Sequence, residues 1–181
     1  MSTQENSRTS LFLMELIICI LFFALASAIC LRLFVGAHVL AEKDENLNHA
    51  LIWSQNLSES FYGCKGRILQ MHNQFPNAFV TMSDNETDGS IVLFFDEDWN
   101  RIDSSLEVAS YEAFIVIQKD TAKNVYSDVY KYGTEFEGDA MVGKIAVLDL
   151  RGQSNTFTSL PEDDKLIIYT SSVDAYIGNN Q

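Results

Sequence analysis

The chain begins with a long run of apolar residues between Leu11 and Val35, which only Glu15 and Arg32 interrupt. The hydrocarbon core of a bilayer is about 30 Å thick, and an α-helix needs about 20 residues to cross it. Arg32 lies near the end of the run, where a long side chain can reach the lipid headgroups. We therefore expect residues 11–35 to form one transmembrane helix.

The helical pattern continues beyond the apolar run, over residues 36–62, which contain no proline. Ala50, Trp53, Leu57 and Phe61 recur at three- and four-residue spacing, which is the spacing of one face of an α-helix. Leu47 and Leu51 flank this stripe, and polar residues such as Asn48, Gln55 and Glu59 lie away from it. The pattern predicts an amphipathic helix whose apolar stripe is covered by the chain that follows.

After residue 63 the pattern changes from the helical period to that of β-strands. Short segments rich in β-branched and aromatic residues alternate with Asp, Asn, Gly and Ser. We expect residues 63–181 to form an antiparallel β domain, with one face packed on the helix and the other in water. The predicted fold class is α+β, a long N-terminal helix packed on an antiparallel sheet. The predicted strands are 78–82, 90–95, 110–118, 124–132, 144–149 and 165–170.

The formal net charge of −13 lies entirely after the apolar run. From Val39 onward there are 23 acidic and 10 basic residues, whereas residues 1–38 contain two of each. An acidic surface repels phosphate, so we expect no nucleic-acid binding by this domain. The acids gather in turns, and residues 96–101, DEDWNR, are predicted to form an exposed acidic turn whose Trp99 packs onto the sheet.

Residues 1–10 form a short polar leader directly before the apolar run. Arg8 is its only basic side chain, and it ends in a small residue, Ser10. Glu15 is the fifth residue of the run that follows. This N-terminus resembles that of type IV pilins and pseudopilins, in which a basic polar leader ends in a small residue and a glutamate follows five positions into an apolar helix.

The resemblance implies a maturation step and an assembly role. A prepilin peptidase would cut between Ser10 and Leu11, and the new N-terminus at Leu11 would be methylated. A carboxylate inside hydrocarbon is costly, and an amine nearby offsets much of that cost. Glu15 would then pair with the freed amine of an adjacent subunit and select correctly staggered neighbours. Ser10 stands where the family usually has glycine, and Leu11 where it usually has phenylalanine.

The same resemblance implies a location and a set of partners. The chain would be a single-pass protein of the bacterial cytoplasmic membrane, and would enter a pilus or pseudopilus on assembly. We expect the N-terminus inside and residues 63–181 outside, because a folded domain follows the helix and the leader is short. The expected partners are the lipid bilayer, other pilin-like subunits and the prepilin peptidase.

Two other interpretations of the N-terminus remain open. Ala26, Ser27 and Ala28 fit the small-x-small cleavage site of a secretory signal, which would leave a chain that begins at Ile29. The apolar run can also be an uncleaved anchor. The chain would then be a membrane-tethered extracytoplasmic binding or sensor domain that does not polymerise.

The residues after the anchor contain no recognisable catalytic motif. His38, His49 and His72 are dispersed, and no nucleophile elbow, phosphate loop or paired-cysteine motif is present. We expect a protein that is not an enzyme and that needs no cofactor.

One acidic stretch has part of a metal-binding pattern. Asp84, Glu86 and Asp88 are spaced like the opening ligands of a calcium loop, but the twelfth position holds Phe95 in place of the bidentate acid. These three acids are a weak calcium candidate. The alternative is an acidic hairpin turn.

Overall fold

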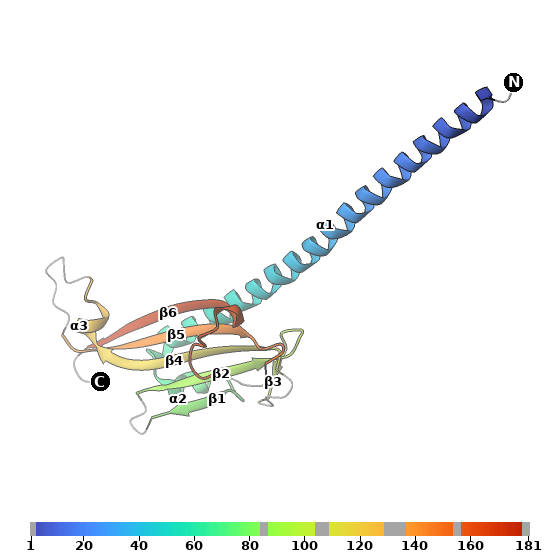
Figure 1. The fold of residues 1–181 in the computed structure, drawn as a ribbon. Helices are drawn as coiled ribbons and strands as arrows, with labels where there is room; N and C mark the ends of the chain where they lie inside the picture. The colour runs from blue at the N-terminus through green and yellow to red at the C-terminus, as the bar shows by residue number, and fades with distance from the viewer. Residues whose placement is uncertain (1–2, 84–86, 104–108, 129–136, 154–156, 179–181) are drawn as a thin grey trace. The chain divides into compact units, whose positions relative to one another are not determined.

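The chain divides into two units, Met1–Glu45 and Asn46–Gln181. Helix α1 (Thr3–Cys64) begins in the first unit and ends in the second (Figure 1). The sheet belongs to the second unit. The computed structural model describes residues 3–83, 87–103, 109–128, 137–153 and 157–178.

In the first unit, the apolar side chains of α1 are exposed. Leu11 is 65% exposed and Phe23 is 75% exposed. Of the helices that the structure describes, α1 is the one long and apolar enough to cross a membrane, and none of its most apolar stretch is buried within the protein. The predicted span at residues 11–35 lies wholly within it.

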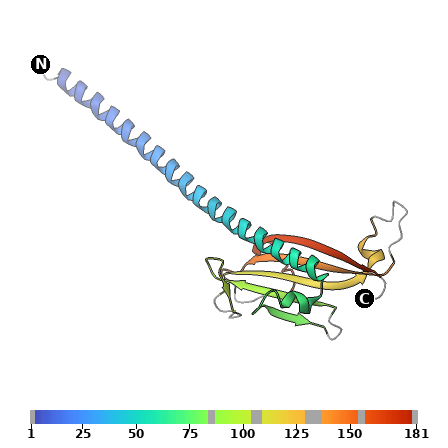
Figure 2. The ribbon, with the colours of Figure 1, turned by 180° about the vertical axis from the view of Figure 1, so that it is seen from behind.

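A six-stranded antiparallel sheet forms most of the second unit (Figure 2). Its strand order is β1-β2-β4-β5-β6, and β3 pairs with β2 beside this path. The predicted α+β fold class is confirmed. The elements are β1 (Phe79–Met82), β2 (Gly89–Phe95), β3 (Arg101–Ile102), β4 (Tyr111–Thr121), β5 (Asp139–Asp149), β6 (Ile167–Gly178), α2 (Ile68–His72), α3 (Ala122–Val125) and the 3₁₀ turn η2 (Asp164–Leu166).

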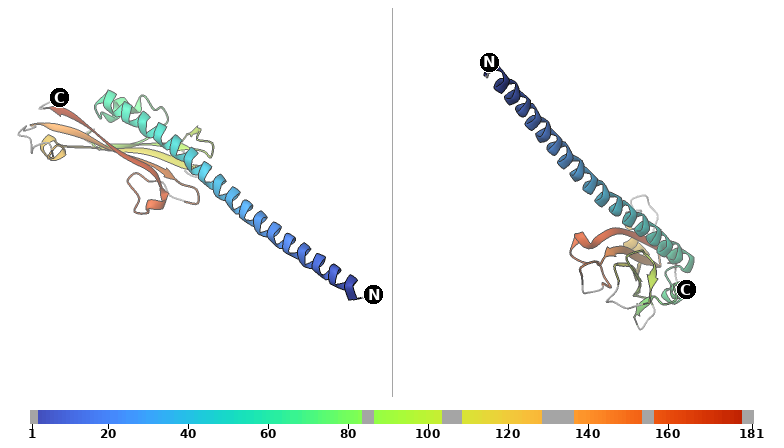
Figure 3. Two further views of the ribbon diagram at one scale, coloured as in Figure 1. Left: turned by 90° about the horizontal axis from the view of Figure 1, so that it is seen from above. Right: turned by 90° about the vertical axis from the view of Figure 1, so that its right-hand side faces the viewer.

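One face of the sheet packs against the C-terminal part of α1 (Figure 3). Ala50, Leu57 and Phe61 are fully buried there and Trp53 is half-buried, so the predicted helical stripe is the face that meets the sheet. Alternate side chains of each strand point to this face. The strand residues of this core are Ile91, Leu93, Phe95, Tyr111, Ala113, Ile115, Ile117, Met141, Ile145, Val147 and Val173.

The prediction that the other face of the sheet lies in water is wrong. A second apolar cluster is buried there, and Phe157 and Ile167 pack against it. Leucine and phenylalanine at alternate positions of central strands expose a large apolar area unless another segment covers it. The chain between β5 and β6 contributes that cover. The cluster consists of Val92, Phe94, Phe114, Ala146, Leu148 and Leu150.

A carboxyl group is buried under the same cover. Glu112 of β4 is 0% exposed, and its two oxygens accept hydrogen bonds from the N–H of Phe157 at 3.3 and 3.2 Å. Burial raises the pKa of Glu112 from 4.5 to about 8, although the bond from Phe157 acts in the opposite direction. Glu112 is therefore mostly protonated at neutral pH.

The predicted strand at residues 124–132 is wrong in the part that the structure describes. Residues 122–125 form α3, and Tyr126 follows it. The hydroxyl of Thr121 accepts a hydrogen bond from the N–H of Asn124 and caps this helix. The cap competes with the extended conformation. Residues 129–132 of the predicted strand lie outside the described residues.

Strand β5 begins five residues before the predicted strand at 144–149. The five additional residues, 139–143, include Gly143, which interrupts the apolar pattern in the sequence. A Cβ at Gly143 would lie 2.8 Å from Val173 Cγ2 and 3.2 Å from the ring of Phe61. Glycine here lets the helix approach the middle of the sheet closely.

The acidic turn, residues 96–100, fixes Trp99 against the helix. The Asp96 carboxylate accepts hydrogen bonds from the N–H of Asn100 at 2.8 Å and of Asp98 at 2.9 Å. These bonds, with that to Asn100 the stronger, lower the pKa of Asp96. Trp99 has a φ of 61°, which a bulky residue rarely adopts, and is buried. The predicted packing of Trp99 is confirmed.

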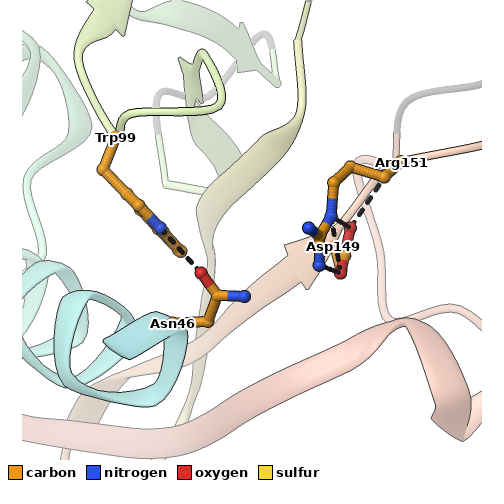
Figure 4. Close-up of polar contacts among 4 residues, drawn as sticks. All are labelled: Asn46, Trp99, Asp149 and Arg151. Carbon is orange, nitrogen blue, oxygen red and sulfur yellow. Dashed lines mark hydrogen bonds and ion pairs between the residues drawn. The ribbon is translucent and has the colours of Figure 1, made fainter. Parts of the chain in front are cut away.

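Trp99 joins the helix to the sheet through one hydrogen bond and a stack of planar groups. Its indole N–H donates to Asn46 Oδ1 on α1 at 3.1 Å (Figure 4). The ring stacks on His49 at 5.1 Å and on Tyr111 at 4.1 Å between centroids. The guanidinium of Arg151 lies 5.3 Å from the centre of the Tyr111 ring. The hydrogen bond to Asn46 and the stacks on His49 and Tyr111 therefore fix the indole ring in place.

We expect Asn46→Ala to lower the free energy of unfolding by about 1–3 kcal/mol, because the buried indole N–H of Trp99 would lose its acceptor. Urea unfolding of the full chain in detergent micelles, followed by tryptophan fluorescence, measures the change. Asn48→Ala, at an exposed position of the same helix, is the matched control and should change stability by less than about 0.5 kcal/mol. Equal effects of the two substitutions would contradict this role of Asn46.

We expect the free energy of unfolding to fall as the pH rises from 4.5 to about 8. Glu112 ionises in the unfolded chain over this interval but stays protonated in the folded chain, so the folded state binds more protons. The slope contributed by Glu112 is at most about 1.4 kcal/mol per pH unit. Glu112→Gln keeps an acceptor for the Phe157 N–H and should flatten the fall. If the free energy of unfolding falls equally with pH in wild type and in the variant, Glu112 is not the cause of the fall.

Candidate functional site

The residues of the predicted processing and assembly segment lie within helix α1. Ser10, Leu11 and Glu15 are helical, and their side chains are exposed. The bond between Ser10 and Leu11 is part of the helix, so a peptidase that cuts it would have to unwind the first turns, which open at low free energy at a helix end.

Glu15 is the only charged residue between Leu11 and Leu31. Leu11 and Glu15 are four residues apart on one helix and lie on the same face, one turn from each other. Arg32 is seventeen residues further along, about 26 Å of helix. The carboxylate therefore has no basic side chain near it on the C-terminal side of the segment. An amine at Leu11 would be the closest cation.

Further along the first unit, α1 carries a shallow hollow centred on Gly36. A Cβ at Gly36 would meet no atom within 4 Å. Small residues let the backbones of two helices approach closely. The residues around the hollow are Ile29, Arg32, Leu33, Gly36, Ala37 and Leu40, all on one face of the helix.

The weak calcium candidate is only partly described. Asp84 and Glu86 lie outside the described residues. Asp88 is described, and its Oδ1 accepts a hydrogen bond from the N–H of Lys119 at 2.8 Å. This bond ties the end of the β1–β2 connection to β4. Among the residues described, no three His, Cys, Asp or Glu side chains come close enough together to hold a metal ion.

A basic pocket of about 120 Å³ lies where the chain leaves α1. Three cations line it: Lys65 and Arg67 follow the helix directly, and Lys119 comes from β4. These are three of the ten basic residues after Val39 in a chain of net charge −13. The remaining lining residues are Gly66, Thr87, Met141 and Ile177.

The backbone conformation of the turn after α1 positions the basic side chains that follow the helix. Lys65 and Gly66 have φ angles of 51° and 71°, and the N–H of Gly66 donates to the carbonyl of Phe61 at 2.9 Å. A Cβ at Gly66 would lie 2.8 Å from the Cβ of Met141. The turn is therefore closed tightly against the sheet and ends the helix in the left-handed conformation that is common at helix C-termini.

The charge of the basic pocket is only partly neutralised. Lys119 Nζ lies 2.6 Å from Asp139 Oδ2, in a pair that is exposed to solvent. Within the part of the chain that the structure describes, Lys65 and Arg67 have no ion pair. The sequence indicated only that the helical pattern ends near residue 63, because Lys119 is more than fifty residues away and joins the pocket through the fold.

Tyr126 and Asp174, near the start of β5 and the end of β6, form a structural contact. The hydroxyl of Tyr126 donates to Asp174 Oδ2 at 2.7 Å. Burial raises the pKa of Tyr126 to about 12, and the bond to Asp174 adds to the shift. The tyrosine is therefore a hydrogen-bond donor at any physiological pH. His49 is stacked on Trp99, and His72 lies on α2.

No family model, curated protein or solved structure matches this chain. Two features of the chain itself therefore bear on its function: an apolar helix with one embedded carboxylate, and a basic pocket on an otherwise acidic second unit.

Proposed function

We propose that this chain is a membrane-anchored pilin-like or pseudopilin subunit that assembles through its N-terminal helix. The observation that carries the proposal is Glu15, the only charge in the apolar span from Leu11 to Leu31. Two further observations support it. The same helix continues as an amphipathic segment, and that segment packs on an antiparallel sheet.

The role of Glu15 follows from the cost of its charge. A carboxylate in hydrocarbon is expensive unless a cation or hydrogen-bond donors compensate it. In the proposed assembly the amine of Leu11 in a neighbouring copy provides that cation after cleavage at Ser10. A copy that is one helical turn out of register leaves the carboxylate unpaired, so the pairing selects the stagger between neighbours.

The rest of the first unit suits contacts with lipid and with other helices. Its apolar side chains are exposed, so the bilayer would cover them before assembly. The hollow at Gly36, together with Ala24, Ala26 and Ala28, would let neighbouring helices approach. In this proposal the precursor sits in the bacterial cytoplasmic membrane with its N-terminus inside, and a prepilin peptidase and other pilin-like subunits are its partners.

The basic pocket favours a second candidate function. A membrane-tethered extracytoplasmic binding or sensor domain needs a built ligand site, and three cations around a 120 Å³ pocket are a site for a small anion. In that case the apolar helix is only an anchor, and Glu15 has no assembly role.

We expect a bifunctional thiol crosslinker to join the native Cys19 and Cys30, both exposed on α1, into multimers larger than dimers in membranes. Glu15→Ala should abolish these multimers, because the register of neighbouring helices would be lost. Denaturing gel electrophoresis measures the products. Glu45→Ala, which removes an exposed acid beyond the apolar span, is the control and should leave the multimers unchanged. Monomers alone in both wild type and Glu15→Ala would support the tethered domain instead.

We also expect N-terminal sequencing of the protein from bacterial membranes to begin at Leu11. The small residue Ser10 then directly precedes the cut, as the resemblance to pilins implies. The same measurement identifies the alternatives: a chain that begins at Ile29 indicates signal peptidase, and an intact chain indicates an uncleaved anchor. Either of these results would rule out pairing of Glu15 with the amine of Leu11.

A further inference from the structure

The basic pocket and the acidic turn have opposite charges and lie at opposite ends of one helical segment. The acidic turn is joined to Asn46 through Trp99, at the start of the second unit. The basic pocket begins at Lys65, directly after the end of α1 at Cys64. The helix between Asn46 and Cys64 is about 27 Å long.

The acidic turn presents two free carboxylates on a rigid backbone. Asp96 uses its carboxylate to close the turn, and Trp99 is locked in its stack. Glu97 and Asp98 between them are exposed, and neither side chain has a hydrogen bond or ion pair within the described residues. A turn fixed in this way loses little conformational entropy when it binds.

The basic pocket offers the complementary geometry. Its volume of about 120 Å³ is suited to one carboxylate group. The guanidinium of Arg67 can hold a carboxylate with two parallel hydrogen bonds, and Lys65 adds a second unpaired cation. The pocket is also fixed, because Gly66 is closed against Met141 and Phe61.

We propose that the basic pocket of one copy receives the Glu97–Asp98 carboxylates of a second copy. The two surfaces differ and lie about 27 Å apart along the helix, so the contact is head-to-tail and can repeat from copy to copy. The contact cannot form within one copy, because the two surfaces of a single copy lie too far apart. This inference rests on the proposed function, since it requires copies to gather in one assembly.

The contact would also reduce the electrostatic repulsion between copies in an assembly. Each copy carries a net charge of −13, so neighbouring second units repel one another. Placing the unpaired cations of the basic pocket on the acidic turn of the next copy replaces part of this repulsion with attraction. The arrangement also fixes the order of copies, because two pockets or two acidic turns facing each other would repel.

Zero-length crosslinking with a water-soluble carbodiimide tests the contact on the full chain in membranes. The reagent activates a carboxylate, the amine of a lysine displaces the activated oxygen, and an amide forms while the reagent leaves as a urea. Mass spectrometry of a mixture of ¹⁴N- and ¹⁵N-labelled copies should identify amides that join Lys65 or Lys119 of one copy to Glu97 or Asp98 of another. The mixed isotope pattern proves that the two residues belong to different copies.

Charge variants provide the controls. Lys65→Glu with Arg67→Glu should lower the yield of amides between Lys119 and the acidic turn about tenfold. Lys144→Glu, at an exposed position of β5, reverses one charge away from the pocket and should leave the yield unchanged.

Restoration separates loss of the contact from loss of the fold. Copies carrying Lys65→Glu and Arg67→Glu, mixed with copies carrying Glu97→Lys and Asp98→Lys, should again yield mixed-isotope amides. These amides would join the amines introduced into the acidic turn to the carboxylates introduced into the pocket.

The outcomes distinguish this inference from the proposed function. If Cys19 and Cys30 form Glu15-dependent multimers but no amide between the pocket and the acidic turn is found, the contact is wrong and the assembly stands. If no multimers form and the amides are absent, both are wrong. If the amides appear in chains that form no thiol-linked multimers, the contact stands without the helix assembly. If sulfate alone at low millimolar concentration abolishes the amides, the pocket is a small-anion site and the proposed contact is overturned.

Discussion

The burial of one stripe of α1 against the sheet is the contact on which the second unit depends. Leu57 and Phe61 are fully buried in it, and without the helix the apolar face of the strands would lie open to water. A sheet that is apolar on one face needs a second layer, and here a single helix provides it. Gly143 allows the close approach, and the bond from Trp99 to Asn46 fixes the helix along its length. The positions of both the basic pocket and the acidic turn follow from this packing, because each lies next to one end of the buried stripe.

Helix α1 meets two different demands along its length. Between Leu11 and Val35 it is apolar on nearly every side, so lipid or other helices must cover it. In the second unit the buried residues of the helix, such as Leu57 and Phe61, form one stripe that packs in a core with the sheet. One continuous helix with these two halves is what a subunit needs if it waits in a membrane and carries a folded domain. Glu15 interrupts the first half near its beginning, and in the proposed assembly its charge would set how neighbouring helices align.

Several acids of the second unit stabilise local structure. Asp96 closes a turn and Asp149 holds Arg151, while Glu112 is buried and mostly protonated. Most of the remaining carboxylates are at the surface. Within the described residues, Lys65 and Arg67 have no ion pair, and they lie together in one pocket. In the proposed contact, the acidic turn of another copy would pair with these two cations.

The sequence by itself determined the elements whose patterns are long and local. The apolar span, the amphipathic stripe at Ala50, Leu57 and Phe61, and the strands β1, β2 and β4 follow from side-chain period, because burial on one face requires it. The resemblance of residues 8–18 to pilins also belongs to the sequence, since it depends on spacing alone, and no comparison with known proteins adds to it.

Tertiary structure decided the features that depend on residues far apart in the chain. The second face of the sheet is covered because Phe157 returns to it, and only that return buries Glu112 and raises its pKa. The helix α3 replaces a predicted strand because the Thr121 cap outweighs a local preference for β-structure. The basic pocket exists because the pairing of β4 with β5 brings Lys119 beside Lys65, whereas local sequence patterns reveal only which residues share a face of one element.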